Sequence, residues 1–205
     1  MSRRSSHRMR FLLVAFVFAA AAVLFPARAE AHLNSTGLGP FYDGFLHFFL
    51  SPEDLLPVLA LSLYAGQRGA AFGRLTLFLL PAAWLLGGWT GLGHNAISST
   101  VVSALSLLLM GGLLAADAKI SLHWFPGVIL ALGISHGDLN GAGLGQADSP
   151  RIVLLGIGTA AFVLVALSAS FAASLRRQWA GVALRVAGSW IAACGILLAG
   201  WAARK

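Results

Sequence analysis

Charge is scarce in this chain. Of its 205 residues, 58% are hydrophobic and only 10% are Asp, Glu, Lys or Arg. Soluble domains average roughly 25% charged residues, so this composition carries too little charge to solvate a globule of this size. We therefore predict an all-α fold, a polytopic membrane helical bundle. The formal net charge is +7, but the basic residues flank apolar runs, which indicates membrane topology and a lipid-bilayer environment, with no nucleic-acid partner.

Cysteine and several catalytic motifs are also lacking. The single cysteine, Cys194, lies in an apolar run, so no disulfide can form within the chain. No GxxxxGK[ST] phosphate loop is present, so the chain itself shows no sign of ATP hydrolysis. Neither HExxH nor HxxxH occurs, and the six histidines are spread over separate elements. These absences predict that the protein is not an enzyme and holds no tightly bound cofactor.

The first 31 residues have the order of a signal sequence. Four arginines precede the apolar run Phe11–Phe25, and a small-x-small pattern follows. This order predicts cleavage after Ala29 or Ala31, with an uncleaved anchor as the alternative, and a mature domain of residues 32–205. Cleavage would place His32 at or near a free amine, where nitrogen atoms suit nickel or copper. His32 as the start of a solvated tail remains the other interpretation.

Six apolar spans then alternate with short polar links, each span near the roughly 20 residues that a membrane-crossing helix needs. The predicted spans are 41–65, 75–91, 96–116, 120–135, 152–174 and 182–203. Gly87 and Gly91 form a GxxxG pair, which predicts that the second span packs closely on a neighbouring helix. The links are too short to hold a second domain.

Basic residues predict the orientation of these spans. If the signal sequence is cut, the mature N-terminus lies outside a bacterial-type cytoplasmic membrane, and six crossings return the C-terminus to the same side. The links placed inside by this topology carry most of the basic residues, in agreement with the positive-inside rule. They are Arg68, Arg74, Lys119, Arg176 and Arg177.

Acidic and histidine side chains gather on the predicted outer side. An ionisable group costs about 2.5–3.5 kcal/mol at a helix centre in lipid, so such groups face a protein interior or a cavity. Carboxylates and imidazoles together form a ligand set for a divalent metal. The candidate metal ligands are His32, Asp43, His47, Glu53, Asp54, His94, His136 and Asp138.

The densest part of this set also has a purely structural interpretation. Ser51-Pro52-Glu53-Asp54 is a helix-start signal, because serine caps helices, proline suits the first helical position and acids suit the first turn. A helix start there implies a break at Ser51, with residues 41–50 forming a short separate helix. A broken helix at membrane depth is tolerated where it lines a cavity. Glu53 and Asp54 are therefore ligands, helix-start residues, or both.

At these residues the chain resembles the HupE/UreJ family of membrane metal permeases. His47, five further residues and Glu53-Asp54 are similar to the family's H-x5-D-H motif, with Asp54 in place of the second histidine. The stretch His136-Gly137-Asp138-Leu139-Asn140-Gly141-Ala142-Gly143 is similar to a later H-G-x-x-H-G-x-E motif, with asparagine and glycine in place of the second histidine and the glutamate. The resemblance implies a signal sequence, six spans and metal-binding motifs in the first and fourth spans.

The function implied by the resemblance is secondary transport. We expect a permease that moves a divalent transition metal, nickel first, inward across the cytoplasmic membrane, with the metal ion as substrate. A metal-dependent intramembrane hydrolase and a non-transporting subunit that holds metal are the alternatives. A homo-oligomer is compatible with the sequence.

Overall fold

The computed structural model describes residues 36–93, 99–145, 147–175 and 178–204, and these residues form seven helices and no strand. The all-α prediction is confirmed for this part of the chain, whereas the predicted signal sequence, residues 1–31, lies outside it. The helices are α2 (Pro40–Leu50), α3 (Pro52–Arg68), α4 (Ala70–Gly91), α5 (Ser99–Ala115), α6 (Phe125–Gly143), α7 (Pro150–Ser174) and α8 (Gln178–Ala202).

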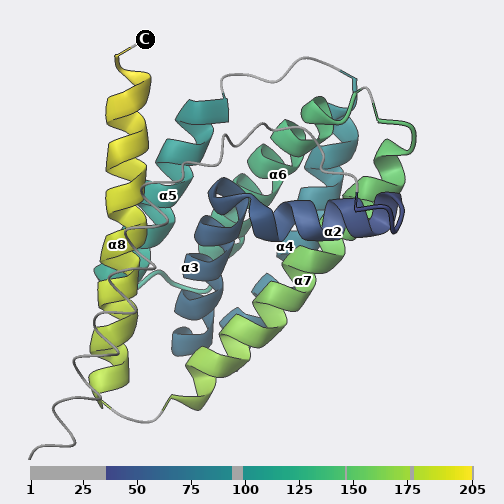
Figure 1. Cartoon of the computed structure of the whole chain (residues 1–205). Helices are drawn as coiled ribbons and strands as arrows, with labels where there is room; N and C mark the ends of the chain where they lie inside the picture. Colours follow the sequence, from purple (N-terminus) through teal and green to yellow (C-terminus); the bar gives the residue numbers. More distant parts are fainter. Residues whose placement is uncertain (1–35, 94–98, 146, 176–177, 205) are drawn as a thin grey trace, which may run out of the picture. The chain divides into compact units, whose positions relative to one another are not determined.

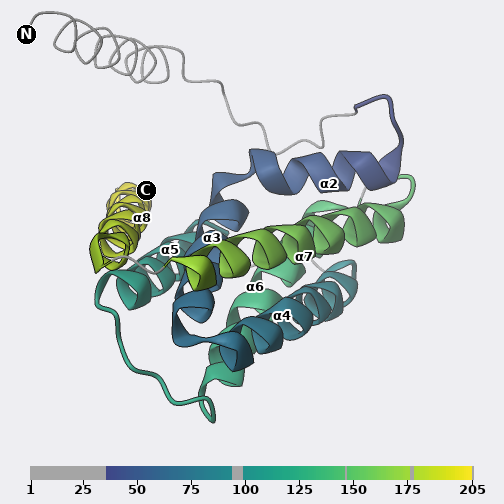
Figure 2. The same cartoon turned by 90° about the horizontal axis from the view of Figure 1, so that it is seen from below.

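The first predicted span is broken at Ser51, so residues 41–65 do not form one straight helix. Ser51 adopts an extended conformation (φ −99°, ψ 95°), because the ring of Pro52 disfavours the helical conformation in the residue before it. The axes of α2 and α3 bend by 73° at this point, and Figure 2 shows α2 turned away from α3 to lie beside α7. The Ser51 side chain does not cap α3 as the sequence predicted; its hydroxyl instead contacts His47, with Oγ 3.4 Å from Nε2.

The fourth predicted span, 120–135, was placed too early. Helix α6 begins at Phe125, where Pro126 suits the first turn, and continues to Gly143. The polar, glycine-rich stretch from His136 to Gly143, which lies beyond the predicted span, is therefore helical. It stays helical because its glycines pack on α4 and its polar side chains find partners inside the bundle. The remaining helices begin or end within five residues of the predicted spans wherever the structure describes those residues.

Among the described residues, three helices are long and apolar enough to cross a membrane: α4, α7 and α8. The bent pair of α2 and α3 is a fourth candidate, and α5 is a shorter apolar helix. Exposed Trp179 and Trp201 lie near the two ends of α8, 22 residues and therefore about 33 Å apart, close to the roughly 30 Å of a hydrocarbon core. The chain is a helical membrane protein, and six crossings remain a prediction.

Helices α4 and α6 meet backbone to backbone, which positions the polar residues of α6. A Cβ atom added at Gly87 or Gly91 would lie 2.2 Å from a carbonyl oxygen of α6, and one added at Gly137 would lie 2.1 Å from the Trp84 carbonyl oxygen. The predicted close packing of the GxxxG pair is confirmed. Only glycine permits this approach, so the pair fixes which face of α6 turns inward.

A second group of contacts joins helix ends that the sequence assigns to one side of the membrane. The Arg68 guanidinium at the end of α3 donates to the Asp117 carboxylate at 2.5 Å and to the Ala118 carbonyl at 2.8 Å. Arg185 of α8 donates to the Ala115 carbonyl at the end of α5 at 3.0 Å. Figure 1 shows α5 and α8 side by side, with α3 between them and α7. Two of the predicted cytoplasmic links, the one after α3 and the one after α5, thus contact each other.

Candidate functional site

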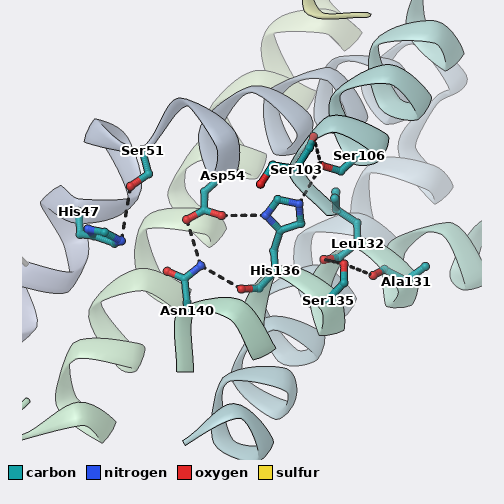
Figure 3. A network of polar contacts seen from close by, with 10 residues as sticks. All are labelled: His47, Ser51, Asp54, Ser103, Ser106, Ala131, Leu132, Ser135, His136 and Asn140. Atoms are coloured by element: carbon teal, nitrogen blue, oxygen red, sulfur yellow. Dashed lines mark hydrogen bonds and ion pairs between the residues drawn. The ribbon is translucent and has the colours of Figure 1, made fainter. Parts of the chain in front are cut away.

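A buried carboxylate–imidazole pair links the start of α3 to the middle of α6. The Asp54 Oδ1 atom lies 2.8 Å from Nδ1 of His136, although the two residues are 82 positions apart. Asp54 is 4% exposed and His136 1% exposed. Asp54 occupies the first turn of α3, where the positive end of the helix dipole favours a carboxylate. Figure 3 shows the two side chains pointing at each other across the helix interface.

Ser106 of α5 completes a chain of three polar side chains. Its Oγ atom lies 2.9 Å from Nε2 of His136 and 3.0 Å from the carbonyl oxygen of Ser103. A hydroxyl has one proton, so it donates either to the Ser103 carbonyl or to the imidazole. In the first arrangement His136 carries a proton on both nitrogens and forms a charged pair with Asp54; in the second the imidazole is neutral.

Asn140, one turn after His136, holds the other carboxylate oxygen. Its Nδ2 donates to Asp54 Oδ2 at 3.0 Å and to the His136 carbonyl at 2.9 Å. Its Oδ1 atom is buried and makes no hydrogen bond within the described structure. Trp84 of α4 packs against the His136 ring, with centroids 5.5 Å apart, and its buried Nε1 also has no hydrogen-bond partner there. An unused acceptor and an unused donor therefore border the Asp54–His136 pair.

The other candidates on α2 and α3 lie outside this hydrogen-bonded network. Asp43 accepts hydrogen bonds from the backbone and hydroxyl of Thr36, each at 2.6 Å, and so closes a local turn before α2. His47 contacts Ser51. Glu53 is exposed at the start of α3 and lies within electrostatic range of Asp54, His136 and His47. Asp43 and His47 therefore make local contacts near the break at Ser51, and Glu53 lies beside the pair without a hydrogen bond to it in the described structure.

Of the remaining candidates, His32 and His94 lie outside the described residues. Asp138 lies on α6, where it lines a cavity with Val102 and Ile134. Within the described residues no three His, Cys, Asp or Glu side chains are close enough to form a metal site by themselves. Among the six candidates that the structure describes, Asp54 and His136 form a direct hydrogen bond, and the ligand set remains a prediction.

Sequence reasoning missed the polar partners of this pair. Asn140 was noted only as a replacement for a histidine, although its spacing of four from His136 places both on one face of a helix. Ser103 and Ser106 lie in an apolar run, where two hydroxyls three residues apart are a weak signal of a polar face. Trp84 gave no signal, because a buried tryptophan is usual in a core.

The arrangement resembles the support that proteins give to metal-binding histidines. Such a histidine usually donates one ring N–H to a carboxylate, which fixes the tautomer and directs the other nitrogen at the metal. Here Asp54 binds the Nδ1 side of His136 and leaves Nε2 facing Ser106. The polar groups gathered here are one carboxylate, one imidazole, one hydroxyl and the unused Asn140 carbonyl oxygen, and both ring nitrogens of His136 are occupied by hydrogen bonds.

Comparisons with known proteins add one finding. The sequence profile of the family described as HupE / UreJ protein matches residues 20–198, which is most of the chain. No curated protein and no solved structure matches the chain.

Proposed function

The chain belongs to the HupE/UreJ family, and from this membership we propose that it is a permease for a divalent transition metal, nickel first. The ion would move inward across a bacterial-type cytoplasmic membrane, with both ends of the mature chain outside. The family supports a role related to metal transport. The choice of nickel, the direction of transport and the terminal orientation are our proposal.

One observation carries this proposal. The two sequence stretches that resemble the family's motifs, one on α2 and α3 and one on α6, meet at the Asp54–His136 pair. A buried carboxylate and imidazole are costly in a membrane protein unless they are paired or used. Asp54, His136 and Asn140 would hold the passing ion, and Ser106 would supply a further oxygen.

The break between α2 and α3 supports a transport role for the same place. The last carbonyl groups of a helix lack intrahelical partners and carry partial negative charge, so the C-terminal end of α2, next to Ser51, favours a cation. Discontinuous helices whose ends meet at a central binding site are a recurring feature of secondary transporters. His47 lies in the last turn of α2 and would contact an ion on its way to Asp54.

A mostly oxygen-based site suits this role. Oxygen ligands hold nickel more weakly than nitrogen ligands do, and an ion in a permeation pathway must also leave its site. Inward movement of a divalent cation gains about 4.6 kcal/mol at 100 mV, inside negative. The membrane potential is therefore sufficient to drive uptake without ATP.

The proposal can be tested in cells that lack their own nickel uptake. Cells producing this chain should accumulate radioactive nickel, and Asp54→Asn should lower the rate at least about tenfold, the smaller end of the loss seen when support of a metal ligand is removed. Asp148→Asn is the matched control, because it makes the same chemical change at an exposed aspartate in the link before α7, and it should retain uptake. Equal rates for Asp54→Asn and the unmodified protein, at equal amounts in the membrane, would refute the proposal.

A second candidate function follows from the order Asp54–His136–Ser106, which matches the order of groups in a serine hydrolase. Ser106, however, lies inside α5, where the neighbouring backbone N–H groups serve the helix, and a hydrolase also needs donors for the oxyanion. A fluorophosphonate probe decides between the two functions. Covalent labelling of Ser106 that is lost in His136→Phe would favour the hydrolase, and we expect no labelling.

A further inference from the structure

Helices α5 and α6 diverge and leave an apolar groove between them. Its cavity volume is about 500 Å³, and its walls include Leu109, Met110, Val128 and Leu132. A neighbouring cavity of about 400 Å³ shares Val102, Ala131 and Ser135 with it and continues toward Leu139. Ser106, the hydrogen-bond partner of His136, also lines the groove, and Figure 3 shows it across from Leu132 and Ser135.

The groove has the depth of one membrane leaflet. It begins beside Trp124, which is 72% exposed and is the residue type that marks membrane interfaces. Gly127, Ala131 and Ser135 then follow at intervals of four residues along one face of α6. Their small side chains leave space for the groove on this face. From Trp124 to Ser135 the helix rises about 16 Å, close to half of the roughly 30 Å hydrocarbon core.

We propose that this groove is a binding site for one acyl chain of a phospholipid, with the headgroup near Trp124 and the chain end near Ser106. The link that leads to Trp124 carries exposed Lys119 and His123, whose charge and hydrogen-bonding capacity suit a lipid phosphate. The proposal concerns a face of the molecule other than the break at Ser51. It does not depend on which ion, if any, the protein transports.

The cavity volume of the groove favours an acyl chain over other occupants. A cavity of about 150 Å³ with apolar walls holds a benzene molecule and excludes water, so a cavity more than three times larger is suited to a longer hydrocarbon. A helix about 10 Å in diameter would fill about 1,200 Å³ over the same depth, more than the groove offers. A second copy of this chain therefore fits poorly as the occupant.

A bound acyl chain would shield the hydrogen bonds of Asp54, His136 and Ser106 from water on the side of the groove. Ser106 is 7% exposed and lies between the groove and His136. With the groove filled by hydrocarbon, water and ions reach His136 only from other directions. Filling the groove thus preserves the low dielectric in which the hydrogen bonds of the network are strong.

Photolabelling tests the site directly. The protein is placed in nanodiscs of phosphatidylethanolamine and phosphatidylglycerol that include phosphatidylglycerol with a diazirine near the end of one chain. Labelling of Met110 and Leu132 is expected, because these wall residues are only 8% and 3% exposed and only a chain inside the groove reaches them. Labelling restricted to exposed residues away from the groove, such as Leu155 of α7, would overturn the proposal.

Substitutions supply the control. Gly127→Leu adds a side chain where the space is open and should abolish the labelling of Met110 and Leu132. Ala131→Leu, which fills the same groove from its exposed wall, should do likewise. Gly181→Leu is the matched control, since its site near the start of α8 is equally open, and it should label like the unmodified protein. Unchanged labelling of Met110 and Leu132 in both groove variants would refute the site.

Discussion

The Asp54–His136 pair should behave as one energetic unit. The change that tests this is a double-mutant cycle with Asp54→Leu, His136→Phe and the two together, which keeps side-chain volume similar and removes the polar atoms. Each single change leaves a buried polar group without its partner, and loss of one member of a buried ion pair costs about 3–5 kcal/mol. His136→Phe is the more severe single change, because the Asp54 charge then retains only the hydrogen bond from Asn140.

The double variant should be more stable than either single variant. Replacing both members of a buried pair with apolar groups of similar shape is often neutral. Here Asn140 and Ser106 still lose one hydrogen bond each, at about 1 kcal/mol per bond. We therefore expect the double variant to lose about 2 kcal/mol and the coupling energy to exceed the cost of either single change.

Reversible unfolding in mixed detergent micelles measures these free energies. Near-additive losses, with a double variant less stable than both single variants, would show that Asp54 and His136 do not form the pair described here. A stable double variant would also separate folding from function, because it retains the fold without the carboxylate and the imidazole.

Three further predictions concern the hydrogen bond from Ser106, the contact between α4 and α6, and the orientation of the chain in the membrane. Ser106→Ala removes one hydrogen bond to His136 and should lower the thermal midpoint by about 2–4 °C, from about 1 kcal/mol; an unchanged midpoint in a thermal scan would contradict the contact. Gly137→Ala should strongly reduce the amount of folded protein in the membrane, because the added methyl group would lie 2.1 Å from the Trp84 carbonyl oxygen, whereas Gly143→Ala meets open space and should be tolerated. Equal abundance of these two variants would mean that α4 and α6 do not meet as described. A reporter that is active only in the cytoplasm should be silent when fused after Lys205, and activity would reverse the proposed orientation.

Much of the fold was predictable because its causes are local. Composition indicated membrane helices, and Pro52 after Ser51 indicated the break between α2 and α3. Gly87 and Gly91 indicated a close helix contact. The end of α6 was not predictable, because glycines and polar residues in one sequence look like a loop until a partner helix is present to pack on them.

The site was predictable only in part because its geometry is set over long distances in the sequence. Asp54 and His136 were both selected, but their direct contact depends on how α3 and α6 pack. Asp43 and His47 make hydrogen bonds to Thr36 and Ser51, and their place in the ligand set stays a prediction. Asn140 became significant only when its side chain was seen to bind the Asp54 carboxylate.

Nickel uptake by the purified protein in lipid vesicles tests the central claim most directly, because no other subunit is present. With an inside-negative potential imposed, vesicles containing the unmodified chain should accumulate radioactive nickel faster than protein-free vesicles. Vesicles with the folded Asp54→Leu/His136→Phe double variant should match the protein-free rate. Equal accumulation in all three preparations would show that the chain alone is no permease, and uptake by the double variant at the unmodified rate would place the pathway elsewhere.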